Sequence, residues 1–276
     1  MTAVSHHPGP ADGTRGARRG LPYLGGHQFR ADLRCYLRNT QSVVFTIFLP
    51  VLFLVILASI FRNTTVKVPG GTIKESVYYV PSLIAWGVIT AAFSNLALSV
   101  VRNRESGIYK RRRATPLPAS AIIAARAAVA VLTALAITVV MLVIGWAAYG
   151  ASIPGRTAPA FALDIIVGAA AFCCLGFAAA TLISNVDAVQ PVVWATVLPL
   201  SFISGIFIPV SALPAWLARI GYVFPVHPLA AALLQAYNPY TAGSGLNWGY
   251  LAILAAWGAA GLIVAVRRFR WLPRGG

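Results

Sequence analysis

Six long runs of apolar residues constrain this 276-residue chain more than any other feature of its sequence. Each run approaches or exceeds the roughly 20 residues that an α-helix needs to cross the hydrocarbon core of a bilayer. The expected spans are residues 42–60, 77–101, 119–148, 160–183, 189–208 and 246–266. The sequence therefore predicts an all-α integral membrane protein with six transmembrane helices.

The composition excludes a soluble chain. Hydrophobic residues make up 58% of the sequence, charged residues only 10%, and the mean hydropathy is +0.76. Soluble domains carry about 25% charged residues, so these few charges cannot cover the surface of a soluble chain of this length. The net charge of +16 lies mainly between the apolar runs, which is typical of juxtamembrane loops. We therefore expect a lipid bilayer, and no nucleic acid, as a partner.

The distribution of Lys and Arg predicts the orientation, because cytoplasmic loops carry an excess of these residues. With the N-terminus inside, 16 of the 22 basic residues fall in the inner segments and 5 in the outer ones. The remaining one, Arg126, falls within the third apolar run. We therefore predict a multi-pass protein of the cell membrane with both termini in the cytoplasm.

The chain before the first span divides into two parts. Residues 1–26 are rich in Gly, Pro and Arg, which predicts a disordered basic tail, whereas residues 27–276 form a single transmembrane domain. Arg30, Arg34 and Arg38 recur every four residues and make a basic stripe beside an apolar face. This pattern predicts an N-terminal amphipathic helix that lies in the membrane interface.

The stretch 210–245 is largely apolar, but prolines break it into pieces that are each too short to cross a bilayer. Short helices that dip into the outer leaflet and return would fit this pattern. We therefore predict an outer re-entrant helical segment between spans five and six. The alternative is one further span around residues 229–237, which would put the C-terminal arginines outside, against the charge distribution.

The segment 102–120, between spans two and three, contains a dense run of charges, followed by the sequence Thr-Pro-Leu, which ends it. An excess of arginine is typical of any inner loop, but it does not explain the sequence Glu105-Ser106-Gly107 in the middle. Ser106 is suited to be the N-cap of a short basic helix over residues 107–113. Such a helix would lie along the membrane surface and dock into a cytoplasmic partner.

The sequence contains no motif for catalysis or nucleotide binding. It has neither the phosphate-binding loop G-x-x-x-x-G-K-[ST] nor the motifs G-x-S-x-G and H-E-x-x-H. Asp164 is the first candidate for a proton relay, but we expect it at the membrane interface near the outer end of span four. We therefore predict a chain that is not an enzyme by itself, with no catalytic residue, no metal site and no cofactor of its own.

Three stretches of the sequence carry a resemblance to a known family. Residues 104–107 read RESG and residues 113–117 read RATPL in the inner loop, and residues 199–209 read PLSFISGIFIP in span five. In this order they resemble the R-E-x-G, R-x-x-P-[LI] and L-x-F-x-S-G-x-F-x-P stretches of permease subunits of type-2 ATP-binding-cassette exporters. The resemblance covers nearly the whole chain from about residue 28. It is closest to the drug-export branch typified by daunorubicin-resistance permeases.

The resemblance implies a permease that works with other chains. Two separate cytoplasmic ATPase subunits would bind ATP and Mg²⁺, and a second permease chain, identical or homologous, would complete the pathway. The inner loop and the interfacial helix would couple the movement of the ATPases to the permease. The residues expected to do so are Arg104, Glu105, Ser106, Gly107, Arg113, Thr115, Pro116, Arg34 and Arg38.

The resemblance also implies a substrate path between the two permeases, with spans two and five facing the partner. The residues expected to line it are Phe93, Asn95, Phe202, Ser204 and Phe207, although ordinary helix packing is the alternative for any one of the aromatic residues. A mostly apolar path suits an amphiphilic drug-like, lipid or glycolipid substrate, moved out of the cytoplasm or the inner leaflet. Two other functions stay open: a secondary carrier, which predicts an acid deep in the bundle, and a membrane scaffold without transport.

Overall fold

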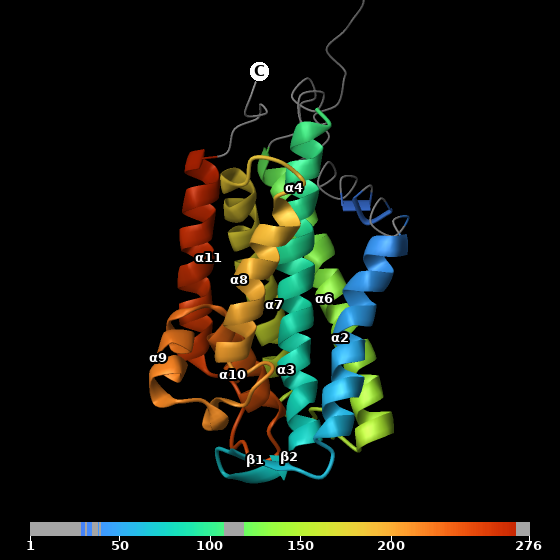
Figure 1. Ribbon diagram of the computed structural model, residues 1–276, viewed down its shortest axis with the longest axis vertical. Coiled ribbons are helices and arrows are strands. Elements are labelled where there is room, and N and C mark those ends of the chain that lie inside the picture. Colours follow the sequence, from blue (N-terminus) through green and yellow to red (C-terminus); the bar gives the residue numbers. More distant parts are fainter. Residues whose placement is uncertain (1–28, 31, 35–37, 39, 108–118, 269–276) are drawn as a thin grey trace, which may run out of the picture.

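The protein is described by a computed structural model, which covers residues 29, 30, 32–34, 38, 40–107 and 119–268. Long helices run side by side in one bundle, with a β-hairpin and two further helices at one end (Figure 1). The long elements are α2 (Thr40–Ile60), α3 (Glu75–Ile89), η1 (Thr90–Ser94, a π-helical turn), α4 (Asn95–Glu105), α6 (Ala119–Tyr149), α7 (Ala158–Leu182), α8 (Val189–Ile203) and α11 (Trp248–Arg268). The others are β1 (Thr65–Val68), β2 (Gly71–Lys74), the 3₁₀ turn η2 (Val210–Ala212), α9 (Ala215–Val223) and α10 (Val226–Tyr237).

Four helices of the described chain are long and apolar enough to cross a membrane. They are the continuous helix Glu75–Glu105, residues Ala124–Tyr149 of α6, α7 and α11, and they match predicted spans two, three, four and six in length and composition. At predicted spans one and five the apolar helices are shorter, Val44–Ile60 within α2 and the whole of α8. With its 15 residues, α8 extends about 22 Å, less than the roughly 30 Å hydrocarbon core of a bilayer. A set of six full-length spans is therefore not confirmed.

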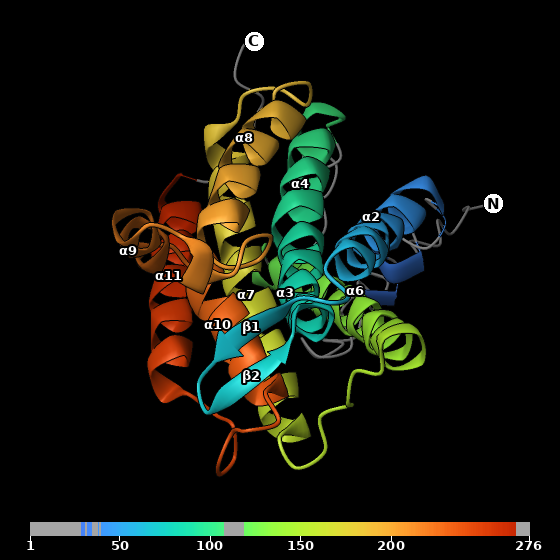
Figure 2. The ribbon, with the colours of Figure 1, turned by 60° about the horizontal axis from the view of Figure 1, so that its bottom comes forward.

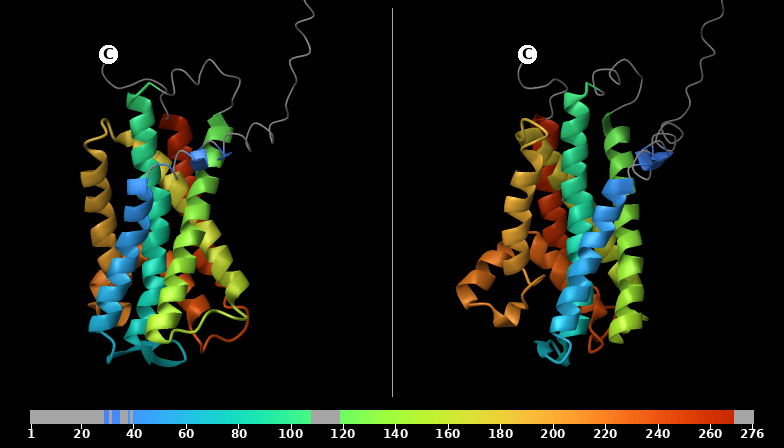
Figure 3. Two further views of the ribbon diagram at one scale, coloured as in Figure 1. Left: turned by 90° about the vertical axis from the view of Figure 1, so that its right-hand side faces the viewer. Right: turned by 45° about the vertical axis from the view of Figure 1, so that its right-hand side comes forward.

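Different elements form the two ends of the bundle. The start of α2, the end of α4, the start of α8 and the end of α11 lie at one end, and the hairpin lies at the other (Figure 3). The first of these carries Arg102, Arg104, Arg267 and Arg268, and we call it the basic end; the other is the hairpin end. The described residues of the predicted interfacial helix are helical, and the basic stripe of Arg30, Arg34 and Arg38 is exposed, as its amphipathic pattern requires.

Span two is longer than predicted and reaches Glu105. At its end the Ser106 N–H donates to the carbonyl of Arg102 (3.0 Å), and Gly107 has a φ of 68°. A glycine in this left-handed conformation just after the last helical residue is a common way for an α-helix to end. Ser106 is therefore the C-cap of α4. Its prediction as the N-cap of a following helix stays a prediction. All but the first residue of the helix expected over 107–113 lies outside the described residues.

Span five ends at Ile203 rather than at residue 208. Gly205, two residues on, has a φ of 88°, a conformation that only glycine adopts readily and that turns the chain away from the helix axis. The hydroxyl of Tyr78 donates to the carbonyl of Gly205 (2.5 Å) and fixes this turn to the start of α3. The apolar run continues past the turn, so hydropathy alone cannot locate the end of the helix.

The prolines of the outer segment break it as predicted. Pro214 and Pro225 are the N-caps of α9 and α10, where a residue without an N–H removes no helical hydrogen bond. The two helices meet at an angle of 97°. Together they are long and apolar enough for one span, but the bend makes them either a broken span or a re-entrant pair.

The two-stranded hairpin of β1 and β2 is a small addition to the predicted all-α architecture, and it lies at one end of the bundle (Figure 2). Val66 and Ile73 lie opposite each other in the antiparallel ladder, and both side chains are buried. Pro69 and Gly70, whose φ is 90°, form the tight turn between the strands. The side-chain amide of Asn238 donates to the carbonyl of Pro69 (2.9 Å) and ties this turn to the end of α10.

Asp164, in the second turn of α7 from the hairpin end, lies in the core between α7 and α10. On α7 one turn to either side of it, Phe161 contacts the ring of Tyr237 (6.1 Å between centroids) and Gly168 packs on Leu229. The helix α10 thus covers this part of α7. The Asp164 side chain is fully buried, and neither carboxyl oxygen has a hydrogen-bond partner among the described residues.

Candidate functional site

The guanidinium of Arg104 binds the C-terminal end of α7. Arg104 points from the last turn of α4 into the bundle and is only 8% exposed. It donates to the carbonyls of Ala180 (3.1 Å), Ile183 (2.5 Å) and Ser184 (3.0 Å). These carbonyls belong to the C-terminal turn of α7 and the link after it, where helical partners are missing and a positive charge is favoured. Arg104 therefore fixes the end of α4 to the end of α7.

Glu105 binds the next part of the same link. Its Oε1 accepts a hydrogen bond from the backbone N–H of Val186 (2.9 Å), three residues before α8 begins. The side-chain oxygen of Asn185 accepts from the N–H of Ala188 (2.9 Å), which orders the remaining turn. Two consecutive residues of α4 thus hold the whole connection from α7 to α8. We call Arg104, Glu105 and the link they bind the RE clamp.

A pocket of about 430 Å³ opens between α2, the η1–α4 segment and α8, towards the basic end. We call it the α2–α8 pocket. Its polar lining residues are Thr46, Thr90, Ser94, Asn95, Arg102 and Gln190. Its apolar lining residues are Phe45, Leu49, Pro50, Leu98 and Trp194. Polar and apolar groups therefore meet in one cavity of the size of a small-ligand site.

The π-helical turn η1 supplies much of the polar lining. A π-turn inserts an extra residue into an α-helix, and such turns occur often at functional sites. Thr90, Ser94 and Asn95 at this turn all reach the α2–α8 pocket. The Asn95 amide donates to the hydroxyl of Thr46 across the pocket (2.8 Å), whereas the buried hydroxyl of Ser94 has no hydrogen-bond partner within the described part of the chain.

An aromatic cluster lies at the inner limit of the α2–α8 pocket. Trp194, which lines the pocket, contacts Trp86 (6.1 Å between centroids), and Trp86 contacts Phe207 (5.3 Å). Phe53 packs against both Trp86 (5.1 Å) and Phe207 (5.3 Å), and Phe202 packs against Phe207 (5.0 Å). These rings run from the α2–α8 pocket to the turn after α8.

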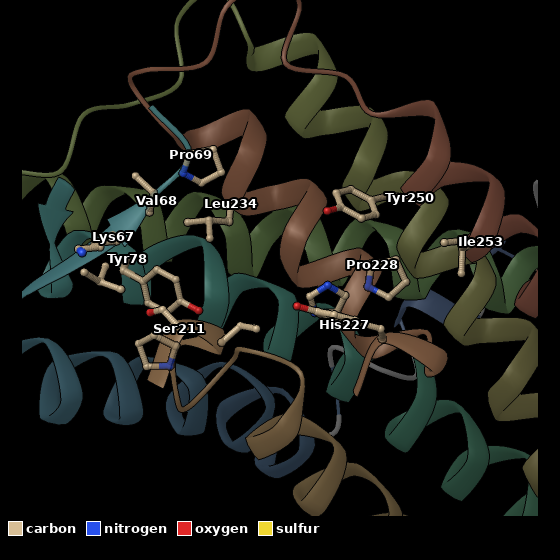
Figure 4. Close-up of a pocket in the computed structure, with 14 residues that line it drawn as sticks. Lys67, Val68, Pro69, Tyr78, Ser211, His227, Pro228, Leu234, Tyr250 and Ile253 are labelled. Carbon is tan, nitrogen blue, oxygen red and sulfur yellow. The ribbon is translucent and has the colours of Figure 1, made fainter. Parts of the chain in front are cut away.

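A second pocket of about 430 Å³, the hairpin-end pocket, lies beyond that turn (Figure 4). Lys67 and Tyr78 lie on one side of it and His227 and Tyr250 on the other (Figure 4). The ring of His227 contacts that of Tyr222 (4.4 Å between centroids), and its Nδ1 lies 3.3 Å from the carbonyl oxygen of Ser204. The hairpin, α9, α10 and α11 together form this pocket.

Comparison with known proteins decides the family. A model of the ABC-2 type transporter family matches residues 28–237, which include the RE clamp, the lining of the α2–α8 pocket and the end of α10. The chain belongs to this family. It is therefore a multi-pass membrane permease, a transport subunit, as the resemblance implies. No curated protein matches the chain.

The predicted coupling residues of this ABC-2 permease fall into four groups. Arg104 and Glu105 form the RE clamp within the chain, so part of the predicted docking motif binds α7 and its link. Ser106 is exposed and Gly107 half-buried at the basic end. Arg34 and Arg38 are exposed on the interfacial helix, whereas the remaining three positions, Arg113, Thr115 and Pro116, lie outside the described residues.

The predicted substrate-path residues are also divided. Asn95 lines the α2–α8 pocket, whereas Phe93 is half-buried and packs against the core. Phe202 and Phe207 belong to the aromatic cluster, and Ser204 is the buried C-cap of α8. Most of the polar lining is missing from the prediction, because no sequence pattern indicates the π-turn that brings it together. No three His, Cys, Asp or Glu side chains gather as metal ligands in the part of the chain that the structure describes.

Proposed function

We propose that this ABC-2 permease is the membrane subunit of an ATP-driven exporter in the cell membrane, with its basic end in the cytoplasm. The family match carries the proposal, and the excess of Lys and Arg at the basic end supports the orientation. The sequence contains no phosphate-binding loop. ATP and Mg²⁺ therefore bind to two separate ATPase subunits on the cytoplasmic side.

The substrate of the proposed exporter is an amphiphile that enters the α2–α8 pocket from the basic end. The pocket supports this class because hydroxyl, amide and guanidinium groups share it with Leu49, Pro50 and Trp194. The aromatic cluster then acts as the barrier between the two pockets, since its rings lie along the route. The hairpin-end pocket is the exit, and opening the barrier requires Phe207 and Trp86 to separate.

A second permease chain, identical or homologous, covers the mouth of the α2–α8 pocket in the proposed assembly. Large apolar side chains are exposed on the two outer helices that border the pocket, with Phe45 and Phe48 on α2 at 59% and 52% exposed. On α8, Val192 and Phe202 are each 46% exposed. Lipid can cover such a face, but a second chain also completes the walls of a pocket that is open on one side.

The RE clamp gives the proposed exporter a route for coupling. The inner loop follows directly on Glu105, and the clamp joins the end of α4 to the link that leads into α8. A movement of the inner loop driven by the ATPases therefore moves α4 and α8 together relative to α2, which changes the width of the pocket between them. In this proposal Ser106, Gly107 and the inner-loop residues contact the ATPases.

Asp164 favours a second candidate, a secondary carrier. A carboxyl that is fully buried without a hydrogen-bond partner in the described chain is what a proton-coupled carrier needs in its bundle. The two functions differ in what drives transport. A proton gradient without ATP would drive a carrier, and Asp164→Asn would abolish that transport, whereas it would leave ATP-driven export close to that of the wild type.

The test is transport in proteoliposomes that hold the chain with its co-purified ATPases. ATP should drive a fluorescent amphiphile across the membrane, and Glu105→Ala should lower the rate with little change in dye binding, because it breaks the clamp and not the pocket. Asp187→Ala is the matched control, since Asp187 is an exposed acid in the same link. Transport that needs only a proton gradient, or equal effects of the two variants, would contradict the proposal.

A further inference from the structure

The charged residues that line the two pockets have one sign only. Arg102 is the single charged residue among the described residues that line the α2–α8 pocket, and no carboxylate lines it. At the hairpin end, Lys67 is the single Lys, Arg, Asp or Glu in the lining, together with His227 (Figure 4). A route with a cation at each end and no acid attracts an anion and repels a cation.

The α2–α8 pocket also separates its polar side from its apolar side. On α4, Asn95, Leu98 and Arg102 follow the helical spacing of three to four residues, so they lie along one face and Arg102 is nearest the basic end. Gln190, in the first turn of α8, adds a second polar group among the lining residues. The apolar wall includes Trp194, one turn further along α8.

From these observations we infer that the substrate is an anionic amphiphile and that Arg102 determines this preference. The guanidinium of Arg102 binds a carboxylate, sulfate or phosphate head group, to which its fork of donors is matched. Gln190 provides a further hydrogen bond, and the apolar part of the ligand lies against Trp194. This inference rests on the proposed function, in which the α2–α8 pocket holds the substrate.

A binding measurement on the full chain, without ATPases, tests the inference. The chain is placed in nanodiscs of phosphatidylcholine and titrated with a dansyl-labelled fatty acid or with the dansyl-labelled alcohol of the same chain length. Energy transfer from tryptophan reports binding, and Trp194→Phe should reduce the signal if the probe occupies this pocket. The acid should bind more tightly than the alcohol.

Arg102→Gln should weaken binding of the acid about tenfold and leave the alcohol unchanged, because a hydrogen bond to a charged group is lost. Arg268→Gln is the control, since Arg268 is an exposed arginine at the same end of the bundle but outside the pocket lining. Arg102→Glu should reverse the preference towards a dansyl-labelled amine. If the Arg102→Gln and Arg268→Gln variants weakened binding equally, the positive charge of the whole surface would attract the acid, and the inference would be overturned. Unchanged binding of the acid to Arg102→Gln would also overturn it.

Nanodiscs that also contain phosphatidylglycerol identify the source of the anion. If membrane lipid occupies the site, this lipid should weaken binding of the acid to the wild type more than to Arg102→Gln; if a dissolved compound occupies it, the two should change equally. Each result agrees with an anionic ligand. If binding of the acid depends on Arg102 but ATP drives no transport, the proposed function is contradicted. If ATP drives transport but substitution of Arg102 leaves binding unchanged, only this inference is contradicted.

Discussion

Arg104→Gln should be among the most destabilising substitutions at the basic end. The guanidinium binds three carbonyls at the end of α7, and its side chain is only 8% exposed. A hydrogen bond to a charged group contributes about 1.5–3 kcal/mol. The three bonds share one side chain, and carbonyls at a helix end can bind water instead, so their contributions are not additive. We expect the free energy of unfolding to fall by about 3 kcal/mol.

The assay is unfolding of the purified chain by SDS in mixed micelles, followed by circular dichroism. Arg102→Gln is the control, because Arg102 lies two residues away on the same helix with an exposed side chain. It should change the free energy by less than about 0.5 kcal/mol. Arg104→Lys should fall between the two, because an ammonium keeps the charge at the helix end but not the fork of donors. If Arg104→Gln were as stable as Arg102→Gln, the role assigned to the clamp would be refuted.

Two further substitutions test the packing around the pockets. Phe207→Ala removes a ring that is 7% exposed and contacts Phe53, Trp86 and Phe202, so it should lower the free energy of unfolding by about 3–5 kcal/mol in the same SDS assay. Phe202→Ala, at a half-exposed position, should lower it by about 1 kcal/mol or less. Similar losses in the two variants would argue against a packed cluster. Gly176→Ala would place a Cβ 2.9 Å from the carbonyl oxygen of Phe93 in the π-turn. This substitution should lower the free energy of unfolding by about 1–3 kcal/mol. An unchanged free energy of unfolding would mean that α7 does not pack tightly on the turn.

The sequence predicts the long helices well, because a helix that crosses a bilayer needs an apolar run and charges or loops mark its limits. It predicts their ends less well. The apolar run at span five continues beyond Gly205, where a positive φ ends the helix. At span two, Arg102 suggests an early end, yet the helix continues to Glu105, and the buried guanidinium of Arg104 is stabilised by hydrogen bonds to carbonyls at the end of α7.

The candidate site shows the same division. Residues 104–107 stand out in the sequence, but the partners of Arg104 and Glu105 lie about 80 residues further along the chain, and no local pattern indicates such pairs. The α2–α8 pocket depends on the π-turn at Thr90–Ser94, which has no sequence signal. Asp164 was expected at the membrane interface, and only the position of α10 over α7 shows that it is buried.

The central claim is that this ABC-2 permease works with separate ATPase subunits, and one measurement tests it most directly. Tagged chain is purified from its native membranes in mild detergent, and the eluate is assayed for ATP hydrolysis and for a second polypeptide that carries a phosphate-binding loop. We predict that an ATPase co-purifies and that its activity is coupled to the permease, so that Glu105→Ala changes the activity and Asp187→Ala does not. A chain that purifies alone, with no ATPase activity in the eluate, would contradict the account.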